Sequence, residues 1–520
     1  MRATKPSIFV FSHLCSPEFV TGAEKLLLFM IREMQPSYDC TLIVPGEGLI
    51  AARARAAGIP VIVLPLPLVV PFYLGLPHLF DELREKLRDP AWSSLVRLLE
   101  SRKPDAVLVS TVVHPLPAVA AKACGIPVMW AVMETIQDTE YTAATAQFIG
   151  AHADRIIGIS ASTLRPFQAP EHVAQSFILP PSWHMEELSP ADWVTNRGSL
   201  RRQLGVEEGQ PLIGYMASSI YENKGFHHYM EMALRVADRF PAARFLIIGN
   251  PVDPPYFERT LDLARRQGRM GLFRYIRFEE RIERLFPAMD ALVVPSLAVE
   301  GFGMTALEGM IFGKAVVSYA SGGLAEIHEA TGNMAYAVQP GDVEGLANQV
   351  SYLIESGQLA AIGERNRQAA EAAFGIDQYR QKLGQLLGQF TPGAGMPARL
   401  VKGGGPTVYL HEGGVLRPFL TERSFLAGGN RYEDVRQVPD EWIDALPKGR
   451  PIGRLPRAAR RGRRGRKRLR SRLRLRKAGR LRMRGHVRRR SGSAKLRRRR
   501  PAAAARGSRI RKAAKRRRRK

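Results

Sequence analysis

Cysteine is scarce in this 520-residue chain, and uninterrupted long apolar runs are missing. Cys15, Cys40 and Cys124 are odd in number and scattered, which argues against a disulfide framework and against a zinc site. The longest apolar stretch, 61–77, contains four prolines, which would break a membrane-spanning helix. The N-terminus lacks the apolar run of roughly 7–15 residues that a signal peptide needs. We therefore expect a cytoplasmic protein, bound at most peripherally to the inner face of a membrane.

Acidic residues are absent from the end of the chain. Residues 451–520 hold 35 of the 78 Lys and Arg but none of the 48 Asp and Glu, and no aromatic residue. Residues 1–450 thus carry 43 basic and 48 acidic residues, a net charge of −5, although the whole chain carries +30. The first 450 residues read as an ordinary globular body. We expect 453–520 to be a disordered Arg/Lys-rich tail, because this composition cannot bury a core.

The body alternates short apolar runs with amphipathic segments, and the alternation restarts after residue 210. This pattern predicts an α/β protein with two doubly wound, Rossmann-like lobes, each a parallel sheet covered on both faces. Ligands of such sheets bind beyond the carboxyl ends of the strands, so two facing lobes would enclose an interdomain cleft. The expected strands are 8–12, 40–44, 61–64, 106–110, 128–132, 155–159 and 177–179, then 212–216, 245–248, 276–278, 291–295, 315–319 and 335–338.

The predicted domain boundaries follow from this alternation. The first lobe covers 1–180, a polar linker 181–210 and the second lobe 211–375, and a terminal helix over 376–390 is able to cross back to the first lobe. Within the first lobe, the apolar spacing predicts one helix over 79–99.

Beyond residue 390, composition changes again. Residues 392–406 are rich in Gly and Pro and indicate a linker. Residues 407–452 predict a small β module with a hairpin turned at Gly413-Gly414. The module is similar to a short β unit appended to some bacterial envelope-associated proteins, a likeness that implies no chemistry.

The most informative motif follows the strand expected at 291–295. Gly301 and Gly303 would let the backbone approach a ligand, and a helix that starts near Gly303 offers free N–H groups. Glu300 in the loop and Glu308 one turn inside the helix would accept hydrogen bonds from two polyol groups. The alternative interpretation is a capping acidic residue followed by an exposed helical glutamate.

This segment resembles the E-x7-E signature of retaining family-4 glycosyltransferases, which have the GT-B fold, and the resemblance extends over about residues 8–390. The other matches are Gly22-Ala23-Glu24 (the donor-side loop, with Thr21 in place of its first glycine), Lys224-Gly225 (the basic site for the donor diphosphate) and Gly322-Gly323 with Glu326 (the G-G-x-x-E element).

The resemblance implies transfer of a hexosyl unit from a nucleotide-diphosphate sugar to the hydroxyl of an envelope glycan, lipid or polysaccharide, with retention of configuration. No metal or other cofactor is expected, since no His, Cys or carboxylate cluster has ligand spacing. Glu300 and Lys224 would be catalytic, the lysine offsetting charge on the leaving diphosphate. The implied donor-binding residues are Gly22, Ser219, Lys224, Gly301, Phe302, Gly303, Met304, Thr305 and Glu308.

Two positions depart from the family pattern. Ser219 stands where the family usually has an arginine, and Met133 stands where many members have a histidine. On the acceptor side we therefore expect Glu134, which is kept, and His114, which would take over from the missing histidine. Two rival functions stay open: a nucleotide-sugar epimerase of the same fold, and a catalytically degenerate body that acts as a surface-tethered binding protein.

Three interpretations of the tail also stay open. Its charge suits a polyanion, and for an envelope glycosyltransferase we favour an anionic membrane or wall polymer. Nucleic acid would also attract it, but the lack of aromatics for base stacking disfavours specific single-strand recognition. The tail would otherwise be a passive extension, or the product of a wrong reading frame, since its composition is typical of translated GC-rich noise.

Overall fold

The computed structural model describes residues 5–453, apart from 278, 280, 391–399, 413–414 and 438–439. The predictions for the tail beyond Gly453, for most of the linker after residue 390 and for the turn at Gly413-Gly414 lie outside these described ranges. Within them, no helix combines the length and the apolar character that a membrane span requires.

The first sheet has seven strands in the order β3-β2-β1-β4-β5-β6-β7, and the paired neighbours run parallel. Successive residues of β1 point to opposite faces, so Phe9 and Phe11 join one apolar cluster while Ile8 and Val10 join another. The strands are β1 (Ser7–Phe11), β2 (Asp39–Val44), β3 (Val61–Val63), β4 (Ala106–Ser110), β5 (Val128–Val132), β6 (Arg155–Gly158) and β7 (Ser176–Ile178).

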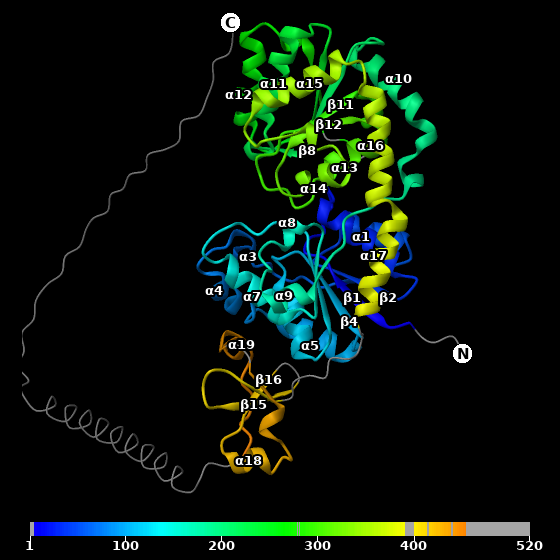
Figure 1. The fold of residues 1–520 in the computed structure, drawn as a ribbon. Helices are drawn as coiled ribbons and strands as arrows, with labels where there is room; N and C mark the ends of the chain where they lie inside the picture. Colours follow the sequence, from blue (N-terminus) through cyan, green and yellow to red (C-terminus); the bar gives the residue numbers. More distant parts are fainter. Residues whose placement is uncertain are drawn as a thin grey trace, which may run out of the picture. The chain divides into compact units, whose positions relative to one another are not determined.

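Helices bury both faces of this sheet, as the near-continuous apolar strands require. Helices α5 and α6 supply side chains to the cluster around Phe9, whereas α1 and α2 supply the cluster around Ile8. Figure 1 shows these elements in blue and cyan. The helices are α1 (Gly22–Met34), α2 (Leu49–Ala56), α3 (Pro71–Leu74), α4 (Leu79–Lys86), α5 (Pro90–Arg102), α6 (Pro115–Ala123), α7 (Thr142–His152), α8 (Ala161–Leu164) and α9 (Pro170–Gln175).

The second sheet repeats the plan with six strands in the order β10-β9-β8-β11-β12-β13. Ile213 and Tyr215 of β8 face a cluster covered by α11, α12 and α15, whereas Leu212 and Met216 face one covered by α13, α14 and α16. The elements are β8 (Leu212–Ile220), α11 (Phe226–Arg239), β9 (Arg244–Pro251), α12 (Pro254–Arg266), β10 (Phe273–Ile276), β11 (Ala291–Val294), α13 (Met304–Ile311), β12 (Ala315–Tyr319), α14 (Gly323–Ala330), β13 (Ala337–Val338), α15 (Val343–Glu355) and α16 (Leu359–Phe374).

Both sheets have the strand order 3-2-1-4-5-6 of doubly wound folds, with one further strand in the first sheet. The predicted α/β architecture of two Rossmann-like lobes is therefore confirmed. The strands lie where the apolar runs predicted them, with shifted ends. In particular, β8 continues to Ile220 rather than Met216, and β10 begins at Phe273 rather than Ile276.

The single helix expected over 79–99 is wrong, because the chain forms α4 and α5 there. The Asp89 carboxylate accepts a hydrogen bond from Ala91 N at 2.8 Å and so caps α5. Pro90 takes the first helical position, where no N–H is needed. The apolar spacing runs on through this break, so periodicity alone merged the two helices.

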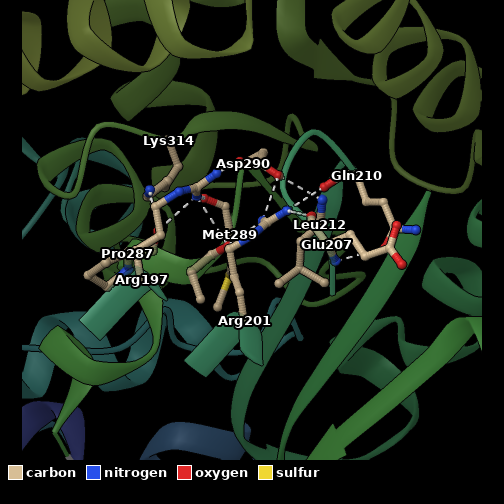
Figure 2. A network of polar contacts seen from close by, with 10 residues as sticks. Arg197, Arg201, Glu207, Gln210, Leu212, Pro287, Met289, Asp290 and Lys314 are labelled. Carbon is tan, nitrogen blue, oxygen red and sulfur yellow. Dashed lines mark hydrogen bonds and ion pairs between the residues drawn. The ribbon is translucent and has the colours of Figure 1, made fainter. Parts of the chain in front are cut away.

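The polar linker expected over 181–210 also contains a helix, α10 (Trp193–Leu204). Two of its three arginines face inward: Arg197 and Arg201 bind the two carboxylate oxygens of Asp290 at 2.7 and 3.1 Å. Asp290 also accepts Leu212 N at 2.8 Å, and Figure 2 shows the guanidinium groups converging on it. Because the charges of Arg197 and Arg201 pair with Asp290 inside the protein, the polar composition of this segment does not indicate an exposed linker.

The helix that follows the second lobe, α17 (Ile376–Gln389), packs against the first lobe. Tyr379 and Leu383 belong to the same apolar cluster as Ile8, and Arg380 Nε lies 2.7 Å from a carboxylate oxygen of Glu33 in α1. Figure 1 draws α17 in yellow next to α1. The chain thus returns from the second lobe to the first.

A four-stranded sheet follows, in the order β16-β15-β14-β17. The predicted hairpin is confirmed by the antiparallel pairing of Glu412 with Val415. The expected linker was too long, because its residues 400–402 form β14, which pairs with two strands of the module. The elements are β14 (Leu400–Lys402), β15 (Val408–Glu412), β16 (Val415–Pro418), α18 (Glu422–Leu426), β17 (Val435–Gln437) and α19 (Asp440–Ala445).

The substitution Asp290→Asn should lower the free energy of unfolding by about 3 kcal/mol, because it leaves the buried Arg201 without its counter-charge. Urea unfolding measures the loss. The matched control is Asp262→Asn, which breaks an exposed ion pair with Arg265 and should cost less than about 1 kcal/mol. Equal losses in the two variants would contradict a structural role for the Asp290 network.

Candidate active site

The loop between β11 and α13 lies at the carboxyl end of the second sheet. The amides of Leu297 and Ala298 donate to Asn223 O at 2.9 and 3.2 Å, which ties the start of the loop to the segment after β8. Gly323 N, at the start of α14, donates to Glu300 O at 2.9 Å and ties its end to the segment after β12. The loop is therefore held from both sides by backbone hydrogen bonds.

Two glycines make this close backbone packing feasible. Gly225 has φ +69°, and a Cβ built on it would lie 1.8 Å from Pro295 O. Gly322 has φ +57°, and its Cβ would lie 2.4 Å from Glu300 O. Any side chain at either position would displace the loop, since both the space and the backbone conformation exclude it. The glycines of the two motifs thus fix where Glu300 sits.

Lys224 and Glu300 form an ion pair in this region. Lys224 Nζ lies 2.6 Å from Glu300 Oε1, and Ser296 Oγ donates to the same oxygen at 2.7 Å. Both charged side chains are largely buried, with 26% and 20% of their surface exposed. Burial acts to lower the pKa of the Lys224 ammonium, but the Glu300 carboxylate outweighs it and the net shift is upward. Lys224 therefore stays charged.

Glu308 lies in α13, one to two turns beyond the loop. Burial raises the pKa of its carboxyl to about 7, and the positive charge of Lys25 opposes that shift. Lys25 belongs to α1 of the first lobe, which begins at Gly22. A Cβ built on Gly22 would meet no atom within 4 Å, so the start of α1 has open space around it.

Thr21, where the family motif has a glycine, caps α1. Its Oγ1 accepts from Glu24 N at 3.3 Å, and the Glu24 carboxylate accepts from Thr21 N and Oγ1 at 2.8 Å each. This reciprocal capping box fixes the start of the helix. The departure from the motif therefore has a local structural reason.

The remaining predicted donor residues lie in three places. Phe302 is a core residue, 4% exposed, whose ring packs edge-on against Phe374 at 5.5 Å. Gly303 caps α13 at φ +104°, and Met304 and Thr305 open that helix, where backbone N–H groups have no intrahelical partner. Ser219 lies farther along β8, paired with Asn250 of β9.

On the acceptor side, Glu134 follows β5. Its two carboxylate oxygens accept from Val112 N at 2.9 Å and from Met133 N at 3.1 Å. Burial raises the pKa of Glu134 to about 7, although these hydrogen bonds oppose the shift. The carboxyl therefore bridges the ends of β4 and β5 and takes up a proton at higher pH than an exposed glutamate does.

His114 lies deeper than the sequence suggested. It precedes α6, is 2% exposed and has its ring 6.3 Å from that of Phe11. Burial, together with the nearby His13, lowers the pKa of His114 to about 3, so the imidazole is neutral. Among the described residues, neither His114 Nδ1 nor Thr111 Oγ1 has a hydrogen-bond partner. Buried polar atoms of this kind mark the carboxyl end of β4.

The loop that carries Glu300 lies against the segment that carries Glu134. A Cβ built on Gly301 would lie 2.9 Å from Met133 O and 3.4 Å from Glu134 Cα. Thr135 Oγ1 donates to Val299 O at 2.7 Å, across the two lobes. The structure thus brings the predicted catalytic residues of the second lobe next to a predicted acceptor-side residue of the first.

Two residues of this region were missed from the sequence. Ser296, which donates a hydrogen bond to Glu300, is the second residue after β11, and that place at the end of a buried strand was its only signal in the sequence. Tyr73 lies on the short helix α3. Burial raises the pKa of its phenol, as do Glu134 and Tyr221, while Lys224 lowers it. Tyr73 therefore lies within electrostatic range of residues from both lobes, and nothing in its local sequence indicates this.

Comparisons with known proteins relate this chain to glycosyltransferases. Residues 210–356 match the family model Glycosyl transferases group 1. A 2-deoxystreptamine N-acetyl-D-glucosaminyltransferase of Streptomyces fradiae is 32% identical over 33% of this chain and 39% of the relative. A D-inositol 3-phosphate glycosyltransferase of Corynebacterium urealyticum is 29% identical over 41% of this chain and 51% of the relative. The chain thus spans about half or less of the length of these two relatives.

The fold is also found among solved structures. Anabaena Alr3699/HepE in complex with UDP and glucose superposes with a TM-score of 0.60 at 20% identity, over 74% of this chain and 100% of that protein. The likeness confirms the predicted GT-B architecture.

The raised pKa of Glu308 predicts a pH-dependent stability. Between pH 4.5 and 7 the folded protein binds more protons at this carboxyl than the unfolded chain does, so its contribution to stability is full below 4.5 and lost as pH rises through about 7. Glu308→Gln lacks this titration. The free energy of unfolding of the variant minus that of wild type should therefore rise by about 2 kcal/mol as the pH increases from 5 to 8.

Urea unfolding at the two pH values measures this gain, and the other titrating groups cancel in the comparison with wild type. The control is Glu344→Gln, at an exposed position in the first turn of α15. A pH-independent difference between Glu308→Gln and wild type would show that Glu308 is not a desolvated carboxyl.

Proposed function

We propose that this protein is a glycosyltransferase that moves a hexosyl unit from a nucleotide-diphosphate sugar to an acceptor hydroxyl, with retention of configuration. The observation that carries the proposal is the Lys224–Glu300 pair, held at the carboxyl end of the second sheet and directly against the Glu134 segment. The family match over 210–356 includes both members of the pair and Glu308. HepE, which shares the fold, was solved with UDP and glucose.

The diphosphate, the hexose and the ribose of the donor would each contact different residues of the site. Its diphosphate would meet the Lys224 ammonium and the free amides of Met304 and Thr305 at the start of α13. Glu300 would then exchange its contact with Lys224 for the hydroxyls of the hexose. Glu308 would accept hydrogen bonds from the ribose. The open space at Gly22, at the start of α1, would let the diphosphate lie close to the backbone of the first lobe.

In the reaction, the bond from the anomeric carbon to the diphosphate oxygen breaks, and the acceptor oxygen bonds to that carbon in its place. The O–H bond of the acceptor breaks as well, and its proton passes to a base on the acceptor side. Negative charge grows on the leaving diphosphate, where the fixed ammonium of Lys224 stabilises it more than it stabilises the bound donor. On the acceptor side, Glu134 and His114 stay predictions. A carboxyl with a pKa of about 7 is suited to exchange a proton with the acceptor.

For the acceptor we propose a polyhydroxylated glycan or lipid of the cell envelope. The two relatives named above act on 2-deoxystreptamine and on D-inositol 3-phosphate, both of which are cyclitols. Turnover of a radiolabelled donor panel should therefore be measured with cyclitol, lipid and polysaccharide acceptors. Product formed without any acceptor would favour the epimerase, and nucleotide binding without turnover would favour the degenerate binding protein.

Glu300→Gln should lower turnover with the best donor by about 100-fold, because it removes a carboxylate that acts on the reacting sugar. Its affinity for the free nucleoside diphosphate should not fall, since the substitution also releases Lys224 from its ion pair. Calorimetry and initial rates measure the two effects. Glu258→Gln, at an exposed ion pair of α12, serves as the control. Native turnover in Glu300→Gln would remove this residue from the site.

We further propose that the basic tail ties the body to an anionic surface. Deletion of residues 454–520 should leave donor turnover unchanged and abolish binding to vesicles that contain anionic lipid. Binding of the full chain should collapse as salt shortens the Debye length from about 10 Å at 0.1 M to about 3 Å at 1 M. Equal binding of both forms at low salt would contradict tethering. Peptide mass mapping of the C-terminus then tests the reading frame.

A further inference from the structure

Glu326 makes a dense set of hydrogen bonds between the two lobes. It lies in the first turn of α14, in the second lobe, and its carboxylate faces α8 of the first lobe. One oxygen accepts from Ala161 N at 2.8 Å, and the other accepts from Ser162 N at 2.7 Å and from Ser162 Oγ at 2.5 Å. A carboxylate that accepts three hydrogen bonds makes a strong, directional contact.

This contact is not the ordinary cap of α8. The helix has its own capping residue, Ser160, whose Oγ accepts from Thr163 N at 3.1 Å. The Ser160 cap does not bind the amides of Ala161 and Ser162. Both amides donate instead to Glu326, about 165 positions along the chain. The first turn of α8 is therefore completed by the other lobe.

The same turn also holds the loop of the candidate active site. Ser160 Oγ donates to Gly301 O at 2.5 Å, directly beside Glu300. Glu300 O in turn accepts from Gly323 N, at the start of the helix that carries Glu326. The contacts form a closed ring: α14 binds α8, α8 binds the loop, and the loop binds α14.

We propose that Glu326 is a positioning residue that keeps the Glu300 loop against the Glu134 segment and so brings the two halves of the reaction together. This inference rests on the proposed glycosyl transfer. Glu326 touches neither donor nor acceptor in this scheme. Its loss should therefore lower kcat while the affinity for the nucleotide persists, because most of the proposed nucleotide contacts come from the second lobe.

Glu326→Ala, Glu326→Gln and the control Glu329→Ala, an exposed position of the same helix, test the proposal in the full chain. Glu326→Ala should lower kcat about tenfold or more, as expected for charge-assisted hydrogen bonds, while the dissociation constant for UDP or another free diphosphate changes less than about twofold. Glu326→Gln keeps one acceptor oxygen, so its kcat should lie between those of wild type and Glu326→Ala. Ser162→Ala, on the opposite side of the contact, should lower kcat in the same direction. Unchanged kcat in Glu326→Ala would overturn the proposal.

Hydrogen exchange followed by mass spectrometry gives a readout that does not depend on activity. The amides of Ala161 and Ser162 should exchange faster in Glu326→Ala than in wild type or Glu329→Ala, and peptides from β9 should be unaffected. If wild-type protein turns over no donor, the proposed function fails, and exchange alone then decides whether Glu326 holds the lobes. Equal exchange in all variants overturns the proposal, as does faster exchange in peptides throughout the chain, which indicates a folding defect.

Discussion

The position of Glu300 depends on a backbone constraint: its loop is packed between two chain segments at distances that leave no room for side chains. Gly225 and Gly322 face carbonyl oxygens of the loop so closely that a Cβ would overlap them. Because carbonyls and amides then pair directly, the loop needs few side chains of its own to hold its shape. The charged group of Glu300 is therefore held by rigid elements, as a group that must meet a reacting sugar should be.

The electrostatics of the region follow from this packing. Lys224 and Glu300 neutralise each other, and burial leaves Glu134 and Glu308 easily protonated near neutral pH. The site consequently holds little uncompensated charge, although it is proposed to bind a diphosphate. Ser219 in place of an arginine makes Lys224 more important. The start of α13 adds partial positive charge without a second basic side chain.

Much of the fold could be predicted because both faces of each sheet are buried. Strands such as β4 and β12 are buried along their whole length and are apolar apart from one serine in each and one tyrosine in β12, so runs of apolar residues predict them. Helix α10 could not be found in this way, because Arg197 and Arg201 pair with Asp290 inside the protein, whereas a polar sequence usually indicates an exposed segment. Glu300 and Lys224 were found through a motif, whereas Tyr73 and the role of Glu326 depend on contacts between distant segments, which no local pattern records.

The polar contacts between the second lobe and the first at this site differ in strength. Thr135 and Ser160 each donate one hydroxyl to a backbone carbonyl, and such neutral hydrogen bonds contribute only about 0.5–1.5 kcal/mol each. Glu326 makes the one charge-assisted contact among those described here between the lobes at this site. The apolar packing of α17 on the first lobe does not depend on any of them. Apolar contacts accompany these hydrogen bonds, because Ile159 and Met133 of the first lobe pack in the same cluster as Phe302 of the second. The polar contacts therefore set the direction in which the Glu300 loop meets the first lobe, and apolar burial adds to the stability of that contact.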